Sequence, residues 1–193
     1  SGKLITTGTA NVIVGGLAGD ALTTGEHNVA IGYAALTNED EDGRNVAVGY
    51  ETLNQQNAGT DAYNVAVGYK GGREITTGVK NTMIGAFAGD AMNTANNNTA
   101  IGYDALTSEV KGGRNVAIGV SALYTQSNSS DLDIYNTAIG YNAGYSMTTG
   151  TNNIIVGGLA GDALTTGSHN IAIGHEALTT EDTGQRNVAI GYN

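Results

Sequence analysis

Short apolar segments recur along the chain, and the same polar and glycine residues frame each of them. The pattern Asn-x-x-(Val/Ile)-Gly occurs eleven times, and eight of the ten spacings are 17 residues, while the other two are 19 and 21. The pattern begins at Asn11, Asn28, Asn45, Asn64, Asn81, Asn98, Asn115, Asn136, Asn153, Asn170 and Asn187. A fixed period of this kind is typical of a solenoid, in which each repeat stacks on the next.

Each repeat, here called a rung and numbered from its Asn as position 0, predicts one short strand. Positions +1 and +3 are β-branched in every rung, position +2 is Ala in eight rungs, and position +4 is always Gly. Alternate side chains of a strand point to opposite faces, and β-branched residues favour strands. We therefore expect a strand at +1 to +3 whose larger residues point inward, with Ala at +2 pointing away from the core. The Gly at +4 predicts a corner.

The second half of the rung supplies one long aliphatic side chain at either of two positions. Five rungs have Leu at +8 and a polar residue at +11, namely Leu36, Leu53, Leu106, Leu123 and Leu178 with Glu39, Gln56, Glu109, Gln126 and Glu181. The other five complete rungs have Gly at +8 and an aliphatic residue at +11, namely Leu22, Ile75, Met92, Met147 and Leu164. This exchange predicts a thin core that is filled to native packing density in every rung.

The pattern predicts an all-β fold, a parallel β-solenoid (β-roll or β-helix) of about eleven 17-residue rungs. Residues 1–193 form a single segment, and Leu/Phe-Ala-Gly-Asp-Ala recurs every fourth rung, which divides it into units of approximately 11–80, 81–152 and an incomplete 153–193. Because strands stack about 4.8 Å apart, eleven rungs extend roughly 50 Å. The chain starts and stops inside a rung, so we expect it to be a segment of a longer fibre.

Composition narrows the classes of function. The chain is 40% hydrophobic and only 13% charged, which favours a folded core over disorder. Its formal charge of −10 argues against nucleic acid as a partner, because phosphates require a basic face. No apolar run approaches the ~20 residues of a membrane span, so we expect no membrane insertion. Nothing in the sequence calls for a cofactor.

The motif resembles repeats of known surface fibres. The stretch Asn98–Leu106, Asn-Thr-Ala-Ile-Gly-Tyr-Asp-Ala-Leu, and the Thr-Thr-Gly that precedes several of the Asn residues resemble repeats of phage tail fibres. The core Asn-x-Ala-Ile-Gly is similar to the head repeats of trimeric autotransporter adhesins, although those repeats are shorter. The resemblance implies an extracellular homotrimer on a virion tail fibre or cell surface, which serves in host attachment by binding a glycan or protein of a host or prey surface. The alanine column at +2 offers a smooth face for an identical subunit, but a monomeric solenoid remains an alternative.

Two rungs carry extra residues, at 54–63 and 124–135, and occupy the same place in successive units. In a solenoid such insertions map to loops on one face, often the binding face. The candidate receptor-binding residues are Gln55, Gln56, Asp61, Tyr63, Gln126, Asp131, Asp133 and Tyr135. The alternative is that both insertions are tolerated surface loops.

Other polar residues receive structural interpretations. The Asn column is expected to form a ladder of amides between rungs. Asp20, Asp90, Asp162 and the acidic run 39–42 are weak Ca²⁺ candidates, and the three His residues lack metal-ligand spacing, so no metal site is predicted.

No nucleophile motif is present, so we expect no catalytic residues and no enzymatic activity. The alternative function is a solenoid enzyme acting on polysaccharide, of depolymerase or acyltransferase type. A recurrent Tyr at +5 favours packing over the stacking of sugars.

Overall fold

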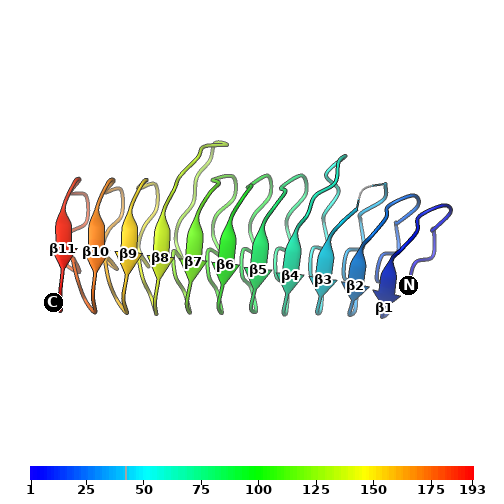
Figure 1. The fold of residues 1–193 in the computed structure, drawn as a ribbon, viewed down its shortest axis with the longest axis horizontal. Helices are drawn as coiled ribbons and strands as arrows, with labels where there is room; N and C mark the ends of the chain where they lie inside the picture. The colour runs from blue at the N-terminus through cyan, green and yellow to red at the C-terminus, as the bar shows by residue number, and fades with distance from the viewer. Residues whose placement is uncertain (42) are drawn as a thin grey trace.

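The computed structural model describes residues 1–41 and 43–193, and they form an all-β parallel solenoid (Figure 1). One sheet contains eleven strands in chain order: β1 (Val12–Val14), β2 (Val29–Ile31), β3 (Val46–Val48), β4 (Val65–Val67), β5 (Thr82–Ile84), β6 (Thr99–Ile101), β7 (Val116–Ile118), β8 (Thr137–Ile139), β9 (Ile154–Val156), β10 (Ile171–Ile173) and β11 (Val188–Ile190). Every strand occupies positions +1 to +3 and pairs in register with the next rung. The predicted fold class and strand positions are confirmed.

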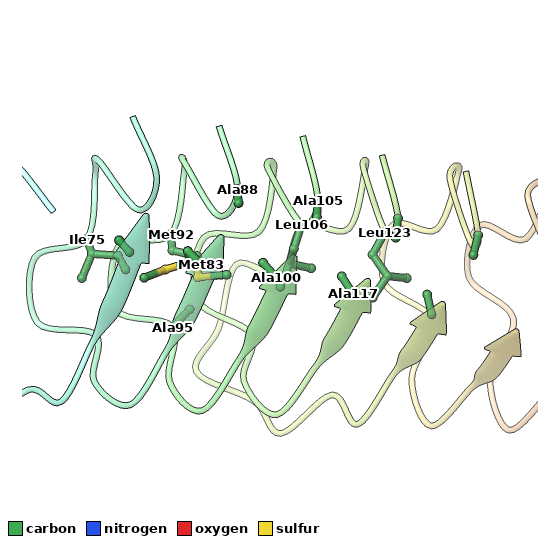
Figure 2. Close-up of a cluster of buried hydrophobic side chains, with 14 of the residues drawn as sticks. Ile75, Met83, Ala88, Met92, Ala95, Ala100, Ala105, Leu106, Ala117 and Leu123 are labelled. Atoms are coloured by element: carbon green, nitrogen blue, oxygen red, sulfur yellow. The ribbon is translucent and has the colours of Figure 1, made fainter. Parts of the chain in front are cut away.

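The predicted orientation of the strands is wrong. Position +2 is buried in all nine inner strands, and Ala30, Ala47 and Ala100 are fully inaccessible, whereas positions +1 and +3 are partly or fully exposed. The reason is the narrow interior, because the long aliphatic of the second half-rung lies directly against the sheet and in most rungs leaves space for little more than the methyl group of Ala. Figure 2 shows this arrangement where Ala100 and Ala117 face the turns that carry Leu106 and Leu123.

The predicted filling of the core is confirmed. The aliphatic side chains at +8 or +11 are fully buried in nine of the ten complete rungs, and Leu178 packs against the same core. The structure adds a third filler at +2, where Met83 and Ile155 replace Ala. A Cβ added to Gly72 would lie 3.0 Å from the Met83 sulfur, and one added to Gly144 would lie 3.1 Å from Ile155 Cδ1. One large residue at +2 therefore fills the space that glycine leaves in the preceding rung.

The Asn column forms a complete ladder, as predicted. The backbone N–H of each Asn from Asn28 to Asn187 donates to the side-chain oxygen of the Asn one rung earlier, at 2.8–3.1 Å. In most rungs the side-chain amide then donates to the carbonyl oxygen 14 residues further on, as Asn81 does to Ala95 at 2.8 Å. These bonds satisfy polar groups that are buried inside the coil.

The Gly at +4 forms the predicted corner. Its φ lies between +129° and +140° in all eleven rungs, and a Cβ on Gly32 would collide with the backbone of Gly49 in the next rung. Residues at −1 and +6 are also left-handed, as in Arg44 (φ 62°) and Glu51 (φ 51°). Such backbone positions cost about 1–2 kcal/mol each outside Gly, so the ladder bonds and packing must hold the tight turns in place.

Candidate functional site: the two long loops

The two insertions form loops that reach beyond the neighbouring turns on the same edge of the coil (Figure 1). The first long loop comprises residues 54–63, between β3 and β4, and the second long loop comprises residues 124–135, between β7 and β8. Both return to the coil through a buried residue, Ala62 or Ile134, whose backbone N–H donates to Gly43 or Gly113 of the preceding rung. The loops are therefore anchored in the same way, and their exposed residues share one side of the molecule.

Each long loop carries the same cluster of Arg, Asp and Tyr. In the first, Arg44 pairs with Asp61 and its guanidinium carbon lies 5.8 Å from the centroid of the Tyr63 ring. In the second, Arg114, Asp133 and Tyr135 repeat this arrangement one unit later along the chain. Four of the predicted candidates thus meet in two equivalent clusters. The arginines were not among the predicted candidates, although Arg44 and Arg114 each stand directly before the Asn of a rung that carries a long loop.

The cluster of the second long loop is the more extensively bonded. Arg114 Nε donates to Asp133 Oδ1 at 2.7 Å, and its guanidinium carbon lies 5.6 Å from the Tyr135 ring centroid. The Tyr135 hydroxyl donates to the other oxygen of Asp133 at 3.3 Å. Because all three side chains are about half exposed, water screens the ion pair, and the cluster serves mainly to orient these groups.

Two of the predicted candidates face the interior. Gln56 and Gln126 are fully buried, and their side-chain oxygens accept hydrogen bonds from Asn64 Nδ2 at 2.7 Å and Asn136 Nδ2 at 2.8 Å. They occupy the +11 position, where rungs with Leu at +8 have room for a polar side chain that binds the Asn ladder. Burial leaves them no surface to offer a receptor. The exposed Gln55 instead bonds to Asn38 at 2.9 Å and to Asn54 at 2.8 Å.

A polar pocket lies beside the second long loop. It measures about 170 Å³ and draws on three successive rungs, with the lining Asn96, Asn97, Lys111, Gly113, Arg114, Asp131, Leu132 and Asp133. Asp131 is fixed by the Thr94 hydroxyl, which donates to its Oδ1 at 2.7 Å across more than one rung. The pocket therefore contains two of the predicted candidates together with two cations that sequence reasoning did not select.

The buried carboxylate of Glu109 ties the second long loop to the rung beneath it. Its Oε1 accepts N–H bonds from Val110, Lys111 and Gly112 at 2.7–3.1 Å and from the Asn128 backbone at 3.1 Å. Its Oε2 accepts from Asn128 Nδ2 at 2.9 Å. Because charged acceptors make the stronger hydrogen bonds, this network fixes Lys111 and the loop relative to each other.

The outer face of the sheet is a second candidate surface, which we call the outer stripe. It consists of positions +1 and +3 of all eleven strands, and all 22 of these residues are Val, Ile or Thr. None of them is buried in the single chain. Beside it, Tyr33, Tyr50 and Tyr69 stack along the coil with ring centroids 5.5 and 5.2 Å apart. Because their faces cover one another, this ladder favours packing over the stacking of a sugar ring.

The other sequence candidates remain isolated. Asp90 lies 3.3 Å from Arg73, and burial raises the pKa of the Asp90 carboxyl above its usual range. Among residues 1–41 and 43–193, no group of three or more His, Asp or Glu side chains is arranged to hold a metal ion. The acidic run 39–42 includes Asp42, which lies outside the described residues. Over the same described ranges, no helix is long and apolar enough to cross a bilayer.

No protein-family model, no curated protein and no solved structure matches the chain.

Proposed function

We propose that the chain is a rigid segment of an extracellular fibre, on a virion tail or a cell surface, that assembles as a homotrimer and contacts a host or prey surface through its long loops. The observation that carries this proposal is the outer stripe. It is a continuous row of 22 uncharged β-branched residues, all of them Val or Ile except Thr82, Thr99 and Thr137, and none of them is buried. Soluble monomers rarely expose large contiguous apolar patches. Such surfaces mark sites of association.

The periodicity of the outer stripe favours further copies of the same chain as its occupant. Its side chains repeat once per rung, about every 4.8 Å, over eleven rungs. A partner whose side chains interdigitate with all of them must have the same repeat, and a second copy in parallel register supplies it. Around a threefold axis each copy presents the same face inward and the assembly closes. The choice of three copies rests on the resemblance to trimeric fibres.

The coil has the properties that a shaft requires. Ten Asn-to-Asn bonds connect successive rungs without interruption, and the core runs as one cluster from Ala18 to Ala177. Gly corners and left-handed turns occur in every rung, so bending the coil would disturb the same close contacts throughout. The two long loops extend beyond this regular surface and are the groups best placed to meet a receptor (Figure 1).

The mass of the assembly tests the proposal. Light scattering is expected to give three times the chain mass of 19.6 kDa. Replacing Ile101 and Ile118 of the outer stripe with Glu is expected to release folded monomers, because buried unpaired carboxylates oppose association. A matched control is Thr60→Glu, which adds charge to the exposed first long loop and should leave the trimer intact. A monomeric wild-type chain would contradict the proposal.

Loop exchange tests the contact with a receptor. Replacing residues 124–135 by the shorter turn of a 17-residue rung should abolish attachment to the target surface while leaving the trimer unchanged. Undiminished attachment by this variant, and by the equivalent exchange of residues 54–63, would show that the long loops take no part in binding.

A further inference from the structure

The cations of this acidic chain are unevenly distributed. Four of the eight Lys and Arg residues, Arg44, Lys80, Arg114 and Arg186, occupy the −1 position directly before an Asn, and so fall in one column along the coil. The pocket beside the second long loop is lined by Arg114 and also by Lys111, which lies four residues before Asn115 in the sequence. The chain has a formal charge of −10, whereas the two cations of this pocket balance its two carboxylates, Asp131 and Asp133.

Three groups in the pocket retain hydrogen-bonding capacity. Arg114 uses Nε on Asp133, so the other four N–H donors of its guanidinium have no partner among the described residues. Lys111 makes no ion pair within residues 1–41 and 43–193, although Glu109 fixes its backbone. Asp131 accepts the Thr94 hydroxyl on Oδ1, and its Oδ2 has no partner in the described part of the chain. The pocket thus offers two cationic donors and one free carboxylate oxygen, while the second carboxylate of the lining, Asp133, is engaged by Arg114 and Tyr135.

We propose that this pocket binds a single carboxylate-bearing sugar residue of a surface polysaccharide. The sugar carboxylate accepts hydrogen bonds from Lys111 and Arg114, and a ring hydroxyl donates to Asp131. The inference rests on the proposed function and names the class of ligand for its binding loop. A pocket of about 170 Å³ has room for one sugar ring, and the rest of a polysaccharide chain would lie outside it.

The charge pattern selects this ligand over other classes. A purely cationic ligand would meet Lys111, which has no ion-pair partner among the described residues. A phosphate dianion would bring two negative charges close to Asp131 and Asp133, whereas a carboxylate brings one. A neutral sugar would give Lys111 no counter-charge to offset its loss of water. A carboxylate together with hydroxyl donors matches all three free groups, and charge-assisted hydrogen bonds supply the larger part of the affinity.

The corresponding place in the first unit is an internal contrast. Counting back from the Tyr that ends each loop, Gly59 and Asp61 correspond to Asp131 and Asp133, and Glu41 stands in the place of Lys111. An acidic side chain at this position repels a carboxylate. We therefore expect one acidic-sugar site per 193 residues, in the second long loop alone.

Titration of the assembled wild-type chain with oligouronates tests the proposal. The panel contains oligogalacturonate, oligoglucuronate and oligomannuronate, each beside its methyl ester, which keeps the sugar and removes the charge. We expect saturable binding of at least one acid, about tenfold or more weaker binding of its ester, and weakening by added salt. Binding of no acid, or equal binding of acid and ester, would overturn the proposal.

Variants locate the site. Lys111→Glu, which installs the residue of the first unit, is expected to weaken binding at least tenfold, and Asp131→Asn, which keeps the side-chain shape, is expected to weaken it several-fold. Lys3→Glu makes the same charge change at an exposed residue outside the pocket and should stay within twofold of wild type. Equal losses in Lys3→Glu and Lys111→Glu would mean unspecific attraction and would overturn the site.

The failure of this inference can be told apart from the failure of the proposed function. If the chain is a trimer and loop exchange abolishes attachment while Lys111→Glu and Asp131→Asn attach normally, the fibre function stands and the acidic-sugar site falls. If the chain is a monomer that attaches to nothing, the fibre function itself falls. Equal melting temperatures of wild type and Lys111→Glu ensure that a loss of binding reports on the pocket.

Discussion

The two long loops stand on nearly identical scaffolds and present different surfaces. Each begins on a rung with Leu at +8 and a buried Gln at +11, and each ends in an Asp–x–Tyr that meets an Arg of the rung before. The second loop is two residues longer and has Asp131 where the first has Gly59. The rung before the second loop has Lys111 where the rung before the first has Glu41. The interior constrains the rung closely, while the loop surface is free to differ in charge and length.

The largest expected effect tests whether the scaffolds are equivalent. Leu53→Ala and Leu123→Ala each remove a fully buried side chain from a rung that carries a long loop. Each is expected to lower the free energy of unfolding by about 2–5 kcal/mol, because the coil cannot collapse around the cavity. Urea unfolding at one fixed protein concentration measures both, since oligomer stability depends on concentration. A large difference between the two losses of unfolding free energy would show that the two scaffolds are not equivalent.

The next largest effect is expected from the hydrogen bonds that attach the second loop to the coil. Asn128 lies in the stretch where the second loop exceeds the first, and it bonds to buried Glu109 through both its backbone and its side chain. Asn128→Ala should cost about 1–3 kcal/mol, because it leaves part of a buried carboxylate without its partner. Hydrogen exchange should show faster opening of the amides of residues 110–112 and 128.

The matched control for Asn128→Ala is Asn57→Ala in the first long loop, since the Asn57 side chain is exposed. It should leave both stability and exchange unchanged. Unchanged exchange in Asn128→Ala would show that Glu109 does not hold the second loop in place, and the two loops would then differ in charge alone.

Sequence reasoning predicted the regular part of the molecule and failed on its orientation. Period 17, the strands at +1 to +3, the Gly corner and the alternating aliphatic fillers all follow from local patterns. Alternation along a strand defines two faces, but it does not say which of them is inside. We assigned the bulkier β-branched face to the core, as most strands would require. In this coil the aliphatic side chains at +8 or +11, which face the sheet, already fill most of the core.

A signal for the correct orientation was present at +2. Three rungs replace Ala there with Ile13, Met83 or Ile155, and all three belong to the five rungs that have Gly at +8. Such an exchange of volume is expected between positions that share a core, and an outward-facing column has no reason to follow it. The same logic applies to the polar +11 residues of the Leu rungs, four of which are buried, and it removes Gln56 and Gln126 from the receptor surface.

The pocket itself was beyond the reach of sequence patterns. Lys111, Arg114 and Asp131 come from consecutive rungs whose loops differ in length, so their proximity depends on how the second loop folds back. That path is set by the bond from Thr94 to Asp131, which spans 37 residues, and by buried Glu109. Neither contact repeats at the period from which the rungs were recognised.

A smaller effect is expected from the paired clusters. Asp61→Asn and Asp133→Asn each remove a surface ion pair with Arg44 or Arg114. Both should cost about 0–1 kcal/mol, with losses that shrink as salt is raised, because exposed pairs are screened. Thermal unfolding in low and high salt measures this. A cost above that range for only one variant would indicate that the corresponding Asp anchors its loop as well as orienting its Arg.

The finest test transfers the charge pattern of the second loop to the first. Glu41→Lys combined with Gly59→Asp places a Lys and an Asp at the positions of Lys111 and Asp131, beside Arg44. Nothing lies within 4 Å of a Cβ added at Gly59, and its φ of 67° is one that Asp tolerates better than most residues. Stability should change little, and titration with the oligouronate that wild type binds should reveal a second, weaker site. If the double variant folds and gains no site, charge alone does not separate the loops, and the two additional residues of the second loop must shape the pocket.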